Sequence, residues 1–209
     1  MSSYGQVGFR AKHMWLLAFA LMTLFVVYQR DLALLDVNSP LRQRYAAVPR
    51  WMLVHGLCGA LALLIAPFQF SNRLRQRHLQ LHRIMGRLYV ACVALAAPAA
   101  VAIALILGPP ILVPASVVQA FGWVVTTATA LYCIRTGRIQ QHREWMLRSY
   151  PFAMVFVVVR VVIAIPAIDR LGELGLASVV WTAIAVAGFL PSFLIAWKNA
   201  FSRRATAMV

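Results

Sequence analysis

The chain has 209 residues, of which 62% are hydrophobic and only 12% are charged, and its mean hydropathy is +0.78. A soluble domain carries roughly 25% charged residues, so this composition excludes a soluble globular protein and indicates an integral membrane protein. The net charge of +15 does not indicate nucleic-acid binding, because the basic residues lie in short links between apolar stretches and not on one polar face.

Six apolar stretches are each long enough to cross about 30 Å of hydrocarbon at ~1.5 Å per residue. They lie near residues 13–30, 50–70, 84–107, 113–134, 146–167 and 177–197. No stretch indicates a soluble domain. The sequence therefore predicts an all-α fold, in which residues 1–209 form one transmembrane bundle of six helices. Its core is expected to be two helical hairpins, residues 50–107 and 113–167.

The first stretch allows a second interpretation. Its strongly apolar part, Met14–Tyr28, is short and follows a basic start, as in a signal peptide. Only Leu32-Ala33-Leu34 follows it, which is not a small-x-small cleavage site. We interpret the stretch as a retained span. Cleavage would leave the other five spans in the same orientation.

The charges of the links predict the orientation in the membrane. Most Lys and Arg residues outside the spans lie in links on the same side as both termini. Cytoplasmic links carry the excess of positive charge, so we expect both termini in the cytoplasm. The same basic links are suited to anionic lipid headgroups. The acidic residues that fall on the opposite side are Asp31, Asp36, Asp169 and Glu173.

The three cysteines, Cys58, Cys92 and Cys133, all lie inside apolar stretches. Their odd number and irregular spacing predict neither a disulfide framework nor a zinc motif. We interpret them as buried thiols in packed helices.

A His-Arg pattern occurs twice, each time where an apolar stretch begins. The copies read His82-Arg83-Ile84-Met85-Gly86-Arg87-Leu88-Tyr89 and His142-Arg143-Glu144-Trp145-Met146-Leu147-Arg148-Ser149-Tyr150. Aligning them requires one inserted residue. If the repeat is real, His82 and His142 occupy matching positions at the same depth of two equivalent hairpins.

Helical spacing gives each copy an inward face, because residues three or four apart share one side of a helix. The two faces are His82, Gly86, Tyr89 and Val93, and His142, Met146, Ser149 and Ala153. Imidazoles on iron with small residues deeper in the bundle are typical of a b-type haem site. His82 and His142 are therefore candidate haem or metal ligands, with Gly86 and Tyr89 beside the group. Arg87 and Arg148 are candidate partners of the haem propionates. Histidine and arginine at a membrane boundary also bind headgroups or only set orientation, and this interpretation stays open.

A second polar pair lies nearer the other end of the spans. His55 and Arg160 are each inside an apolar stretch, and no Asp or Glu lies within any of the six stretches. An arginine inside a span usually faces the interior or a partner, although it can also reach the headgroups. We predict that His55 and Arg160 line one cavity in the outer leaflet.

Taken together, these motifs resemble a bacterial family of multi-pass membrane proteins, the domain of unknown function two-three-zero-six. The resemblance covers roughly residues 50–200. It rests on His55, Leu81-His82-Arg83, Gly86-Arg87-Leu88-Tyr89, His142-Arg143, Trp145-Met146, Arg148-Ser149-Tyr150 and Arg160. The resemblance implies a bacterial inner-membrane protein, and it implies no particular activity. The arrangement also resembles four-helix cytochromes of the b type, which place histidines at both membrane faces. With only His55 on the second face, at most one bis-histidine haem is expected.

Three functions are consistent with these residues. The first is a b-type haem electron carrier, linked to a quinone or a redox partner, with His82 and His142 on iron. The second is a non-catalytic binder or carrier of an anionic lipid, a quinone or a small amphiphile. The third is an accessory membrane subunit. Hydrolysis is not supported because the sequence has no G-x-S-x-G motif.

Overall fold

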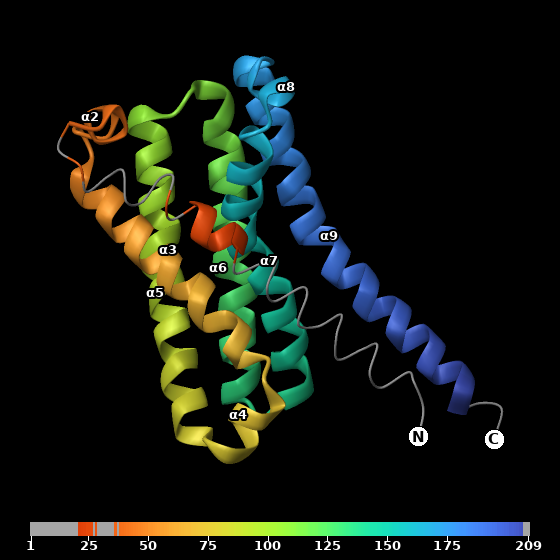
Figure 1. Cartoon of the computed structure of the whole chain (residues 1–209). Coiled ribbons are helices and arrows are strands. Elements are labelled where there is room, and N and C mark those ends of the chain that lie inside the picture. The colour runs from red at the N-terminus through yellow and green to blue at the C-terminus, as the bar shows by residue number, and fades with distance from the viewer. Residues whose placement is uncertain (1–20, 27, 29–35, 37, 207–209) are drawn as a thin grey trace.

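The computed structural model of the chain describes residues 21–26, 28, 36 and 38–206 (Figure 1). In this part of the chain every regular element is a helix, and five helices are long and apolar enough to cross a membrane. They are α3 (Pro49–Gln69), α5 (Leu79–Leu107), α6 (Val113–Arg135), α7 (Ile139–Ile163) and α9 (Gly172–Thr206). The predicted all-α membrane bundle is thus confirmed. The first predicted span, 13–30, lies mostly outside the described residues. Residues 21–26 of this span are described, and they are helical.

Four short helices lie at the two ends of the bundle (Figure 1). They are α2 (Pro40–Arg44), α4 (Asn72–Arg77), η3 (Pro110–Leu112) and α8 (Pro166–Asp169). The start of α4 is capped by Ser71, whose Oγ accepts from the backbone N–H of Leu74 at 3.3 Å. The end that holds α4 is called the α4 end below, and the end that holds α2 and η3 is called the α2 end.

Helices α3, α5, α6 and α7 form a four-helix bundle. Helix α3 packs chiefly against α5 and α6 chiefly against α7, which confirms the two predicted hairpins. Contacts of α5 with α6 and of α7 with α3 close the bundle, so α5 and α7 lie diagonally across it. Helix α9 packs mainly on α7 and runs along the outside at an angle (Figure 1).

Small side chains allow these helices to approach closely. Lipid tails are as apolar as leucine, so helices associate in a membrane through close packing and interhelical hydrogen bonds. The fully buried positions of the bundle include alanines on three of its helices, namely Ala62, Ala66, Ala96, Ala99, Ala115 and Ala130. This packing leaves the larger Tyr89 and Trp123 as the main aromatic groups in the middle of the bundle.

Two helices begin earlier than their apolar stretches. Helix α5 begins at Leu79 and α7 at Ile139, where hydropathy alone predicted starts near 84 and 146. The polar first turns contain no helix breaker, so the helices continue through them. As a result, His82 and His142 are each the fourth residue of their helix, and counting from them without an insertion pairs Arg87 with Leu147. Ser149, and not Tyr150, is then the counterpart of Tyr89.

The end of α7 also differs from the prediction. The helix ends at Ile163, four residues before the predicted limit, and α8 begins at Pro166. The residue before a proline is disfavoured in the α conformation, and Ile165 is accordingly extended, with φ −77° and ψ 119°.

Candidate functional site

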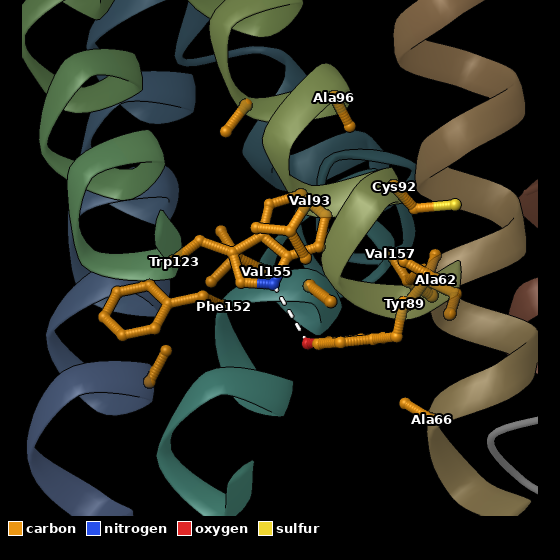
Figure 2. Close-up of a cluster of buried hydrophobic side chains, with 14 of the residues drawn as sticks. Ala62, Ala66, Tyr89, Cys92, Val93, Ala96, Trp123, Phe152, Val155 and Val157 are labelled. Carbon is orange, nitrogen blue, oxygen red and sulfur yellow. Dashed lines mark hydrogen bonds between the residues drawn. The ribbon is translucent and has the colours of Figure 1, made fainter. Parts of the chain in front are cut away.

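A ring of hydrogen bonds occupies the middle of the bundle. The indole Nε1 of Trp123 lies 3.1 Å from Oη of Tyr89 (Figure 2), and Oη lies 2.8 Å from Oγ of Ser149. Ser149 Oγ is 2.7 Å from Oγ1 of Thr127, which is 2.7 Å from the backbone oxygen of Trp123. All four side chains are buried. The ring therefore joins α5, α6 and α7 through their interior.

The chemistry of the two ends fixes the direction of every bond in the ring. An indole N–H only donates and a carbonyl only accepts. Thr127 must use its single proton on the carbonyl of Trp123, so it accepts from Ser149. Ser149 in turn accepts from Tyr89, and Tyr89 accepts from the indole of Trp123. Each hydroxyl donates once and accepts once, and none has a proton left over.

The hydrogen-bond ring fills the interior of the bundle on the side of His82 and His142 that faces the membrane centre. Ser149, a small residue expected to leave space for a flat cofactor, is bonded directly to Tyr89. Gly86 is also covered, because a Cβ at this position would lie 3.5 Å from Oε1 of Gln69 on α3. A macrocycle placed deeper than the histidines would have to displace both contacts. The small residues of the predicted haem face thus lie against side chains of neighbouring helices.

The two histidines themselves differ in their bonding. His142 donates from Nδ1 to the backbone oxygen of Ala130 at 2.8 Å, which leaves Nε2 as the acceptor of the neutral ring. Nδ1 of His82 and Nε2 of Gln69 are both buried and have no hydrogen-bond partner among the described residues. Each histidine lies in the first turns of its helix, and both helices begin at the α4 end. Their joint role as ligands stays a prediction.

The two candidate propionate partners do not join this group. Arg87 is exposed. Arg148 points to α9, where its Nε donates to Oγ of Ser192 at 3.1 Å, and its guanidinium lies 4.9 Å from the ring centroid of Trp145. Their role at a haem stays a prediction.

The α2 end of the bundle contains a cavity of about 480 Å³. All four bundle helices contribute to its wall, and α9 and the helical residues 21–26 contribute a few side chains. Neither His82 nor His142 lines it, whereas Trp123 and Phe152 do. Since Trp123 also belongs to the hydrogen-bond ring, the ring holds one wall of this cavity in place.

His55 and Arg160 both line this cavity. His55 donates from Nδ1 to the backbone oxygen of Ala96 on α5 at 3.0 Å, and its ring meets that of Phe156 edge-on with 5.4 Å between centroids. The guanidinium of Arg160 lies 4.4 Å from the same Phe156 ring. Phe156 is therefore the shared contact of the imidazole and the guanidinium, which also interact electrostatically.

Other polar groups in the cavity wall were not singled out from the sequence. Arg44, Ser116 and Gln119 also line the cavity. Gln119 had a recognisable signal, because it is an isolated amide within the apolar stretch 113–134. Arg44 had none, since it lies in a link and reaches the cavity only through the position of α2.

The fold and this cavity define a multi-pass helical membrane protein with a four-helix core and a cavity at one end. A family model described as Predicted membrane protein (DUF2306) matches residues 52–198. The chain belongs to this family, whose description states no activity. No curated protein and no solved structure matches the chain significantly.

Proposed function

We propose that the protein binds a small anionic amphiphile in the cavity at the α2 end and acts as a non-catalytic binder or carrier. The observation that carries the proposal is the cavity of about 480 Å³, which combines a mainly apolar wall with His55 and Arg160. Ligand sites are typically cavities of about 300–1,000 Å³ with apolar walls and few polar groups. With both termini cytoplasmic, as the link charges predict, the cavity lies in the outer half of the membrane.

The volume of the cavity supports a ligand with one chain. A non-hydrogen group occupies about the volume of a water molecule, ~30 Å³, so the cavity of about 480 Å³ accommodates roughly sixteen such groups. A single acyl chain or a ring with a short tail fits this number. A phospholipid with two long chains would extend well beyond it.

The charge of the wall supports an anionic head. Among the described residues the lining contains Arg44, Arg160 and His55 but no Asp or Glu. Placing an arginine within the hydrocarbon region costs about 2.5–3.5 kcal/mol on insertion scales. An anionic ligand group offsets part of this cost through charge-assisted hydrogen bonds with the guanidinium.

Replacing Arg160 by glutamine tests the proposal. Loss of one partner of a desolvated charge pair costs about 2–5 kcal/mol, so we expect the Kd for a fluorescent fatty acid to rise at least about thirtyfold. The matched control is Arg170→Gln, because Arg170 is exposed, follows α8 and does not line the cavity. Equal affinities of Arg160→Gln and the wild type would overturn the proposal.

A b-type haem held by His82 and His142 is the second candidate function. The bond from Nδ1 of His142 to the carbonyl of Ala130 favours it, since metal-bound histidines commonly donate their other nitrogen to a carbonyl. The contact of Tyr89 with Ser149 disfavours it.

We therefore expect protein purified in detergent from haem-replete cells to be colourless. The absorption spectrum checks this. A Soret band that disappears in both His82→Ala and His142→Ala would establish the haem function instead, and an unchanged Arg160→Gln variant would then fit that result.

A further inference from the structure

Three neutral polar side chains of the cavity wall, His55, Ser116 and Gln119, donate hydrogen bonds to backbone oxygens. Nδ1–H of His55 donates to the carbonyl of Ala96 at 3.0 Å. A carbonyl only accepts, so Nδ1 must carry the proton. In the neutral ring Nε2 is then an acceptor, and it is the polar atom that His55 can offer to a ligand.

Helix α6 repeats this arrangement at two positions. Oγ–H of Ser116 donates to the backbone oxygen of Leu112 at 3.0 Å, so its single proton is used and its oxygen lone pairs remain. Nε2 of Gln119 donates one of its two hydrogens to the backbone oxygen of Phe152 at 3.2 Å, which leaves its second N–H and the acceptor Oε1. Ser116 and Gln119 are three residues apart and share one side of α6.

The wall of the cavity therefore divides its hydrogen-bonding roles. The arginines supply donors and positive charge, His55 and Ser116 offer acceptors, and Gln119 offers the acceptor Oε1 beside its second N–H. Helices α3 and α6, which carry these acceptors, lie diagonally across the bundle. A plain carboxylate carries no donor, so it satisfies the arginine and leaves the acceptors unpaired.

We propose that the cavity selects amphiphiles whose head carries an O–H or N–H donor beside its anionic or carbonyl oxygen. The oxygen binds Arg160, and the donor binds an acceptor of the wall, with His55 as the residue that determines specificity. This proposal rests on the function proposed above. Hydroxy fatty acids and N-acyl amino acids share the chemistry, and the competition experiment distinguishes them.

The test compares ligands that differ only in the donor. Hexadecanoate and 2-hydroxyhexadecanoate compete with a bound fluorescent fatty acid in the detergent-purified wild type. A net hydrogen bond contributes about 1 kcal/mol, so we expect the hydroxylated acid to bind about fivefold more tightly. N-dodecanoylglycine and N-dodecanoylsarcosine, in which a methyl group replaces the N–H, form a second pair, and a similar preference for the glycine conjugate supports the same acceptor wall with an amide head.

Variants assign the preference to individual residues. His55→Phe keeps a ring beside Phe156 but cannot accept a hydrogen bond, so we expect the ratio of the affinities for the hydroxylated acid and hexadecanoate to fall from about five to about one. Gln119→Leu provides a second test if the first variant does not fold. The control is Gln140→Leu, because Gln140 is exposed on α7 and does not line the cavity.

The outcomes separate this proposal from the function on which it rests. If the wild type binds the members of both pairs equally, the cavity is a ligand site without a preference for donors, and the present proposal is overturned. If the preference persists in both His55→Phe and Gln119→Leu, the assignment to this wall is wrong. If none of the four ligands displaces the probe and Arg160→Gln has no effect, the proposed function itself fails.

Discussion

Replacing Gly56 and Gly59 by leucine is expected to abolish ligand binding while the bundle remains folded. Both glycines line the cavity, and a Cβ at either position would meet nothing within 4 Å. Two leucine side chains add eight non-hydrogen groups of ~30 Å³ each, which is about half of the cavity. Glycine inside a helix costs roughly 0.5–1 kcal/mol relative to alanine, so the substitutions also favour the helix.

The measurement is displacement of a fluorescent fatty acid, together with thermal unfolding in the same detergent. Gly59→Ala gives an intermediate point, because it removes much less volume. The control is Ala196→Leu on α9, which adds a leucine at an exposed position away from the cavity wall. Unchanged affinity in the double variant would show that the ligand binds elsewhere.

Replacing Tyr89 by phenylalanine is expected to lower the free energy of unfolding by about 2–4 kcal/mol. The change removes one oxygen from a side chain with no exposed surface. The indole N–H of Trp123 then loses its acceptor and Oγ of Ser149 loses its donor. The indole N–H, left without a partner, costs about 1–3 kcal/mol, and the lost bond to Ser149, which keeps its bond to Thr127, adds about 1 kcal/mol.

Titration of detergent-purified protein with SDS measures this loss. The control is Tyr132→Phe, the same chemical change on α6 at a side chain that is 57% exposed. Surface substitutions of this kind change stability by less than about 0.5 kcal/mol. If the two variants unfold alike, the hydrogen-bond ring contributes no stability. Because the indole N–H of Trp123 loses its acceptor, Tyr89→Phe is also expected to shift the tryptophan emission.

The architecture could be predicted because it follows from the lengths of apolar stretches and the sequence of the links. The Gly108-Pro109-Pro110 link separates two spans in the sequence and joins α5 to α6 in the structure. The early starts of α5 and α7 were missed because hydropathy records only the apolar part of a helix. Their polar first turns have the composition of a loop and the backbone of a helix.

The candidate sites, too, could be predicted only in part from the sequence. The inward faces of α5 and α7 could be predicted from helical spacing, and they do face the interior, since Tyr89 meets Ser149 there. The groups that the opposite helices supply could not be predicted, because no pattern in one sequence links Gly86 to Gln69 or Tyr89 to Trp123. For this reason, space expected beside Gly86 and Ser149 is occupied in the structure.

The hydrogen-bond ring around Trp123 also determines what the middle of the bundle can offer to a polar molecule. Its donors all run in one direction around the ring and end on a carbonyl oxygen of the residue that begins it. The indole N–H and the three hydroxyls each use their single hydrogen within the ring. The ring therefore presents no free N–H or O–H donor to the cavity wall on one side or to the helix starts on the other.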